Sequence, residues 1–302
     1  MRIRFQGLRV ILSGTRRYPA IRALLLVGPA IGWILAFSIV PLFIVIGYSF
    51  LTSGGSGAIL PTITVENYTK LWTTSLYRRV LLESLLIGVE ATVITMLLGY
   101  PVAYRLGRLK SRFTPLLVLL VLLPFWTSYL VRIFAWLVML MDNGVINWFL
   151  LSLKLIANPI QLLFTHLGVV IGIVYSALPF AILPIYAVIA GIDEDLISAA
   201  KVLGANDQQT FREVVFPLSV PGLAAGVILT FIYAVGSFLA PAILGGNSAV
   251  MIANIIATAF LELFNWPFAS ALTVSLLIVM LIVLGVMTKI VSLDTIYGAQ
   301  GK

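Results

Sequence analysis

The sequence predicts an all-α polytopic membrane protein with about six transmembrane helices. Of its 302 residues, 61% are hydrophobic and only 10% are charged, and the mean hydropathy is +1.11. Several apolar runs reach about twenty residues, the length that an α-helix needs to cross a bilayer. Because the backbone finds no water to bind inside a bilayer, such runs are expected to be helical. The chain length therefore limits the number of spans rather than the number of soluble domains.

A basic segment precedes the first span. Residues 1–22 contain six arginines and no acidic residue, and the chain is then apolar from Ala23 to Phe50. This apolar run is far longer than the core of a signal peptide, and no small-residue cleavage site follows it. We therefore expect an uncleaved first span with a basic cytoplasmic tail, residues 1–22, ahead of a transmembrane domain formed by residues 23–302.

Five further spans are expected. A polar stretch, residues 51–79, follows the first span and is expected to be a loop with a short surface helix near Tyr68. Two shorter apolar stretches are expected to enter the membrane only partly, because neither is long enough to cross it; they are residues 141–166 and 245–266. The remaining spans are predicted at about residues 80–104, 113–137, 167–190, 221–244 and 268–291.

Basic residues are distributed unequally between the two sides of the membrane. With the N-terminus inside, 14 Lys and Arg residues fall on the cytoplasmic side, 4 on the other side, and Arg132 within a span. Loops rich in Lys and Arg remain in the cytoplasm. We therefore expect both termini, and the polar loop at residues 191–217, to be cytoplasmic.

That polar loop, residues 191–217, predicts two short helices. Three acidic residues begin it, where the dipole of a helix N-terminus favours negative charge. Gly204 is expected to cap the first helix, Asn206 with Gln209 to cap the start of the second, and Pro217 to end it. Four apolar residues recur at the spacing of one face of the first helix: Leu196, Ala199, Ala200 and Leu203.

Several functional classes are excluded by composition. A phosphate-binding loop needs glycines followed by Lys and Ser or Thr, and the terminal Gly298–Lys302 lacks that spacing. The absence of cysteine excludes a thiol nucleophile, a disulfide framework and thiolate-bound metal. The net charge of +8 is explained by membrane topology, so no nucleic-acid partner is expected. If ATP drives this protein, a partner must hydrolyse it.

The polar loop resembles a motif of permease subunits of ATP-binding-cassette (ABC) importers. Ala199-Ala200, Gly204 and Val214-Val215-Phe216-Pro217 match the spacing of the Glu-Ala-Ala…Gly…Ile-x-Leu-Pro motif, with Ser198 where the motif has Glu. Four other runs resemble the permeases of spermidine/putrescine importers: LLPFWTSYLVRIFAW (122–136), DNGVINWFL (142–150), SFLAPAILGG (237–246) and NWPFASAL (265–272).

This resemblance implies a type I ABC importer permease fold in the bacterial inner membrane. It also implies a second permease subunit, a cytoplasmic ATPase dimer that holds ATP and Mg²⁺, and a periplasmic substrate-binding protein, all beside membrane lipid. The subunit itself would hold no cofactor and would be no enzyme. The solute would be a polyamine or a related organic cation, with an opine or amino compound as the alternative. The ATPase would contact Leu196, Ser198, Ala199, Ala200, Leu203, Gly204 and Pro217.

Three acidic residues are candidates for contacting a cationic solute. A charge inside a span costs about 3 kcal/mol on insertion scales, so each needs a reason. Glu83 and Glu90 are seven residues apart on one face of the second span. The alternatives are an interfacial position for Glu83 and a hydrogen bond between helices for Glu90. Asp142 lies at the outer end of the third span, where it could instead belong to a turn.

Two aromatic residues are further candidates. Trp126 and Tyr129 lie deep in the third span beside Pro124 and could offer π faces to a cation. Arg132 would repel such a solute, so we expect it to pair with a carboxylate or with backbone carbonyl groups.

Two other classes of membrane protein agree less well with the sequence. A secondary transporter would show an inverted repeat with paired broken helices, and the two halves of this chain share no motif. An intramembrane enzyme would need a catalytic dyad or a metal cluster. One histidine, no cysteine and scattered carboxylates provide neither.

Overall fold

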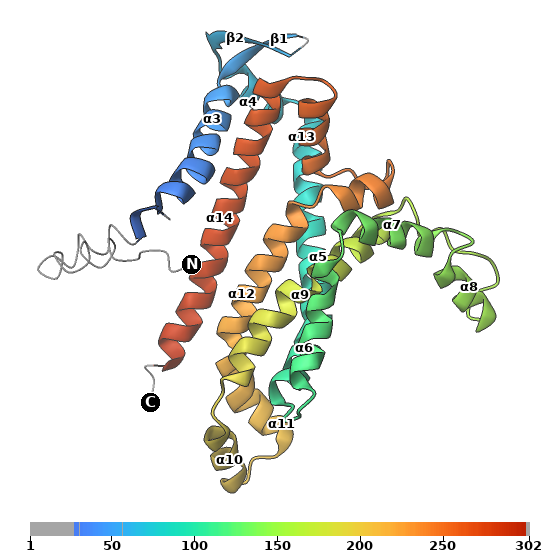
Figure 1. Ribbon diagram of the computed structural model, residues 1–302, viewed down its shortest axis with the longest axis vertical. Coiled ribbons are helices and arrows are strands. Elements are labelled where there is room, and N and C mark those ends of the chain that lie inside the picture. The colour runs from blue at the N-terminus through green and yellow to red at the C-terminus, as the bar shows by residue number, and fades with distance from the viewer. Residues whose placement is uncertain (1–26, 30, 56, 300–302) are drawn as a thin grey trace, which may run out of the picture.

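The computed structural model describes residues 27–29, 31–55 and 57–299, so the basic tail predicted at residues 1–22 lies outside the described residues. Within the described chain the prediction of six long apolar helices is confirmed, and most of them run along the long axis of the molecule (Figure 1). These candidate spans are Val27–Ser49, Ser75–Arg108, Tyr129–Ser152, His166–Ala190, Asp207–Val235 and Trp266–Lys289.

A small cap of two strands and a short helix lies at one end of the molecule (Figure 1). The first span, which includes η2 (Leu35–Ile39) and α3 (Val40–Ser49), leads into it. The short helix expected near Tyr68 is confirmed as α4 (Glu66–Thr73), whereas the two-stranded sheet beside it was not predicted. Gly55 and Gly57 have φ of 81° and 85°, which allows the chain to reverse between the strands. The antiparallel strands are β1 (Leu51–Gly55) and β2 (Ala58–Ile63).

Three helices form the centre of the bundle: α5 (Ser75–Arg108), α9 (His166–Ala190) and α12 (Phe216–Val235). Small residues allow their backbones to approach closely, as is common between membrane helices. A Cβ atom added at Gly222 of α12 would lie 2.8 Å from the carbonyl oxygen of Pro184 in α9. A Cβ atom at Gly107 of α5 would lie 2.7 Å from Cγ2 of Ile189.

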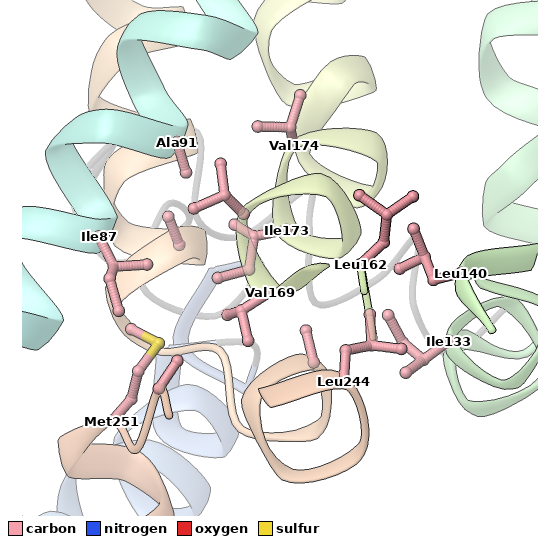
Figure 2. Packing of buried hydrophobic residues seen from close by; sticks show 14 of the residues in the cluster. Ile87, Ala91, Ile133, Leu140, Leu162, Val169, Ile173, Val174, Leu244 and Met251 are labelled. Carbon is pink, nitrogen blue, oxygen red and sulfur yellow. The ribbon is translucent and has the colours of Figure 1, made fainter. Parts of the chain in front are cut away.

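An apolar core joins this centre to the segments beside it (Figure 2). Figure 2 shows side chains from α5, α7 (Tyr129–Leu140), α9 and η5 (Pro241–Gly245) that point toward one another. The labelled residues include Ile87, Ile133, Leu140, Val169, Ile173 and Leu244, all of which are buried.

The predicted third span, about Phe113 to Leu137, is wrong as a single helix. The structure has α6 (Thr114–Leu122) and the 3₁₀ turn η3 (Leu123–Trp126), and then breaks before α7. Thr127 and Ser128 are extended at the break, with ψ of 146° and 135°. Pro124 lies in the first turn of η3, and the break follows three residues later. The Thr127 hydroxyl donates to the Pro124 carbonyl oxygen at 2.9 Å and caps the first segment.

The expectation that Pro217 ends the second short helix is also wrong. Residues Asp207–Val235 form one continuous helix of 29 residues, made of α11 (Asp207–Thr210), the π-helical turn η4 (Phe211–Val215) and α12. Pro217 lies in the first turn of α12, directly after η4. A π-helical turn changes the hydrogen-bond register locally, which is consistent with a helix that continues through the missing amide of a proline.

The last elements also differ from the predicted spans. The helix of the predicted fifth span, 221–244, ends at Val235, and the separate π-helical turn η5 follows it. The expected short segments are found as α8 (Val145–Ser152) and α13 (Ile252–Leu261). The chain then enters α14 (Trp266–Ala299), which packs beside α3 and α13.

Candidate functional site

The polar loop folds as a capped helical hairpin at the end of the molecule opposite the β-strands (Figure 1). Its first helix is α10 (Glu194–Val202), where the Asp193 side chain accepts a hydrogen bond from the Asp195 amide at 3.0 Å. Gly204 has a φ of +91°, which confirms the predicted left-handed cap. The predicted capping pair is also confirmed. The Gln209 amide donates to Asn206 at 2.8 Å, and the Asn206 amide donates to Gln209 at 2.9 Å.

Ion pairs hold the hairpin to the C-terminal end of α5 and the residues that follow it. The Glu194 carboxylate lies 2.8 Å from Arg108 Nη1 and 3.4 Å from Lys110 Nζ. The hydrogen bond from Arg108, helped by Lys110, holds the pKa of Glu194 below its ordinary value. Lys201 Nζ lies 2.8 Å from Asp207 Oδ1, and this contact joins the two helices of the hairpin. Ile197 is buried against the bundle, so α10 is anchored through one side chain of its inner face.

The opposite face of α10 is apolar and uncovered. Leu196 is 50% exposed, Val202 87% and Leu203 88%. Ala199 and Ser198 are exposed as well, and Ala200 is half-buried. Within the part of the chain that the structure describes, most of the predicted stripe is therefore left uncovered. Val202, which the spacing did not single out, is exposed beside Leu203. The exposed side chains of Leu196, Val202 and Leu203 are called the apolar tip below.

Aromatic packing joins the second helix of the hairpin to α5. The Phe211 ring lies 5.2 Å from Tyr104 and 6.1 Å from Tyr100, measured between ring centroids. The Tyr100 hydroxyl lies 2.8 Å from the Ser219 hydroxyl on α12. The hairpin is therefore continuous with α12 and clamped to α5, so that these three elements form one connected unit.

The acidic candidates lie near the other end of the bundle, and two of them have partners. Glu83 pairs with Arg79 one helical turn away, at 2.8 Å. Glu90 Oε2 lies 2.6 Å from His166 Nε2, a contact between α5 and α9. Glu83 and His166 also line a small cavity of about 180 Å³. Asp142 is exposed in the turn between α7 and α8, and its carboxylate makes no ion pair with the described residues.

The aromatic candidates lie on either side of the break between η3 and α7. Trp126 is 73% exposed, whereas Tyr129 is half-buried with its hydroxyl 3.2 Å from the Ser237 hydroxyl. The guanidinium of Arg132 lies over the Tyr129 ring at 5.6 Å. Its Nε and Nη1 are buried without a hydrogen-bond partner among the described residues, so the pairing expected for Arg132 is not found there.

Sequence reasoning missed the residues that the fold brings to Tyr129. Tyr233 lies 6.2 Å from Tyr129 between ring centroids, and Phe180 lies 5.1 Å from Tyr233. These rings come from α12 and α9, more than fifty residues away along the chain. The spacing of neighbouring residues could not reveal this group of rings. A feature of the sequence near it is Gly236-Ser237, a pair that indicates the end of a helix and follows α12.

Comparisons with known proteins agree with this architecture. Residues 91–295 match the family described as "Binding-protein-dependent transport system inner membrane component". The chain is 41% identical over 248 residues to the spermidine/putrescine transport system permease protein PotB of Haemophilus influenzae, covering 82% of this chain and 86% of that protein. It is 40% identical over 250 residues to PotB of Escherichia coli K12, covering 83% and 90%. The trehalose transport system permease protein SugB of Mycobacterium tuberculosis is 30% identical, covering 80% and 81%.

Solved structures show the same fold. A bacterial ABC transporter involved in the import of the acidic polysaccharide alginate contains a chain that superposes with a TM-score of 0.74 at 19% identity, covering 93% of this chain and 98% of that one. The alginate transporter in complex with a pentasaccharide-bound periplasmic protein gives a TM-score of 0.74 at 18% identity, covering 94% and 97%. At these identities the likeness concerns the fold alone.

Proposed function

Because the chain belongs to the family of binding-protein-dependent transport system inner membrane components, we propose that it carries polyamines, or a related small organic cation, into the cell. Members of this family are multi-pass inner-membrane permeases of ABC importers, and the ATP is bound by a separate ATPase. The observation that carries the choice of solute is the identity of about 40% to two spermidine/putrescine permeases over more than four-fifths of the chain.

The hairpin is the proposed docking site for a cytoplasmic ATPase dimer. Three features of the hairpin support this assignment: its apolar tip is uncovered, it lies at one end of the bundle, and it continues into a span. A helix that lies in a groove of its partner presents anchors at i, i+3 and i+4. Leu196, Ala199, Ala200 and Leu203 have this spacing, and Ser198, Gly204 and Pro217 shape the same hairpin.

A second permease subunit and a periplasmic binding protein complete the proposed machine. The positive-inside distribution of charge supports an orientation with both termini and the hairpin in the cytoplasm. Residues 23–302 would then form the transport domain and residues 1–22 a cytoplasmic tail. Trp126, Tyr129, Asp142, Glu83 and Glu90 remain the proposed contacts along the solute path.

The experiment that tests this function is uptake by the complete importer in proteoliposomes. Labelled putrescine and spermidine are offered with the cognate binding protein, beside trehalose and an amino-compound solute. We expect ATP-dependent uptake of the polyamines. ATP-dependent uptake of another solute without polyamine uptake would refute the cation assignment. Uptake by this subunit without an ATPase would instead identify a secondary transporter.

A further inference from the structure

Two helix breaks lie close together at the edge of the bundle. The first is the extended pair Thr127-Ser128, which lies about 20 Å along the helical path from Thr114 and therefore within a hydrocarbon core about 30 Å thick. The second follows α12, where Gly236 and Ser237 precede η5. The contact of 3.2 Å between the hydroxyls of Tyr129 and Ser237 joins the two breaks.

Irregular backbone inside a membrane needs a polar or protein environment. It is tolerated where it is buried in protein or faces a water-filled cavity, and not where it faces lipid. Thr127 and Ser128 are exposed in this chain, so in the membrane they must face water or another subunit. A cavity of about 360 Å³ lies next to the second break, lined by Tyr129, Ile232, Tyr233, Gly236, Ser237, Phe238 and Leu239. This volume lies within the range of small-molecule sites, about 300–1,000 Å³.

The wall of this cavity is aromatic and hydroxylated. Tyr129 and Tyr233 end a row of rings that continues through Phe180 to Phe125, with centroid distances of 6.2, 5.1 and 5.2 Å. The row takes one ring each from α7, α12, α9 and η3. Aromatic faces attract cations, and hydroxyl oxygens accept hydrogen bonds from N–H groups. No carboxylate lies among the residues that line the cavity.

We propose that the cavity beside the second helix break holds an ammonium group of the solute within the membrane, against the rings of Tyr129 and Tyr233 and the hydroxyl of Ser237. This proposal rests on the proposed import of an organic cation and gives that solute a site that the acidic candidates, on other parts of the chain, do not form. A site made of π faces and neutral oxygens binds a cation without neutralising its charge. Such a site is expected to bind the solute weakly and to release it quickly.

Arg132 places a resident positive charge beside this cavity and so allows the sign of the solute charge to be tested. Its guanidinium already lies over the Tyr129 ring at 5.6 Å, with two nitrogens unpartnered among the described residues. The same charge repels an ammonium group that enters the cavity, so it weakens binding and speeds release. A solute carboxylate would instead be attracted to the unpartnered nitrogens. Removing the charge of Arg132 must therefore change the binding of cations and anions in opposite directions.

The first test measures uptake of labelled spermidine by the complete importer at saturating binding protein. Tyr233→Leu removes the ring, and we expect maximal uptake to fall about tenfold while the ATPase activity stimulated by the binding protein persists. Tyr233→Phe keeps the ring, so uptake should stay within threefold of wild type. Tyr175→Leu is the matched control, because Tyr175 lies on α9 against Trp136 and outside this cavity. Assembly with the ATPase, followed by size-exclusion chromatography, identifies variants that fail to fold.

The second test uses the sign of the charge effect. In the purified complex, Arg132→Gln should retain at least threefold more labelled spermidine than wild type, whereas Arg132→Lys should resemble wild type. Lower retention in Arg132→Gln would overturn the proposal, as would equal losses of uptake in Tyr233→Phe and Tyr233→Leu. If wild type transports spermidine and Tyr233→Leu does so equally well, the site is refuted while the proposed function stands. If wild type transports only an anion, both are refuted.

Discussion

Leu203 offers the most direct test of the docking surface. Its side chain is 88% exposed in this chain, so truncation to Ala removes almost no contact that folding of the subunit requires. If the ATPase buries this side chain, the loss of its apolar surface should cost about 2 kcal/mol. Since about 1.4 kcal/mol corresponds to a tenfold change in an equilibrium constant, the affinity for the ATPase should fall about thirtyfold.

The assay titrates the purified ATPase against the two permease subunits held in nanodiscs. Leu263→Ala is the control, because Leu263 is 65% exposed and follows α13, far from the hairpin. We expect the control to bind like wild type and Leu203→Ala to keep the thermal stability of wild type. Binding of Leu203→Ala within twofold of wild type would refute docking through the apolar tip. A loss of thermal stability would show instead that the side chain contributes to the subunit itself.

Three further predictions concern the hairpin and the helix contacts. Ser198→Glu should leave transport within a few-fold, because Ser198 is exposed and its hydroxyl holds no charge; complete loss in an assembled complex would contradict this. Protection of residues 191–206 from hydrogen exchange should persist at neutral pH and fall only below the ordinary Glu194 pKa of 4.5, since the pKa is lowered in the fold. Glu194→Gln should reduce this step but not remove it, because Lys201 also lowers the pKa of Asp207 in the same hairpin; an unchanged step would exclude the Glu194 ion pair as a cause. Gly222→Ala should lower thermal stability by about 1–3 kcal/mol, because its Cβ would meet the Pro184 carbonyl oxygen at 2.8 Å; Gly285→Ala, which meets nothing within 4 Å, should not.

The sequence predicted those features that depend on local spacing. The apolar runs, the Gly204 cap and the pair Asn206–Gln209 each depend on a few neighbouring residues, and all but the run at residues 113–137, which is broken, are found as predicted in outline. The exposed apolar face of α10 was predicted in the same way, from the helical spacing of its residues. A helical period showed which residues share a face, although it could not show that Ile197, rather than Leu196, faces the bundle.

Two predictions were wrong because the effect of a proline on a helix depends on neighbouring contacts that the sequence does not show. Pro124 was placed inside a continuous span and instead precedes a break, whereas Pro217 was expected to end a helix that continues through it. A proline removes one amide in both cases. The surroundings differ: after Pro124 the chain leaves the helix at Thr127, whose hydroxyl donates to the Pro124 carbonyl, whereas Pro217 lies in the first turn of α12 after a π-helical turn. Neither arrangement follows from hydropathy.

The continuity through Pro217 has a mechanical consequence. The helix Asp207–Val235 begins at the hairpin and contains Tyr233 near its other end, about 40 Å away at 1.5 Å per residue. The proposed solute cavity therefore lies at one end of this helix, and α10, which carries the proposed ATPase contact, is joined to its other end through Gly204–Asn206. Had Pro217 ended that helix, a displacement of the hairpin could be absorbed by a flexible joint. Because it does not, we expect closure of the ATPase to move Tyr233 on α12 relative to Tyr129 on α7.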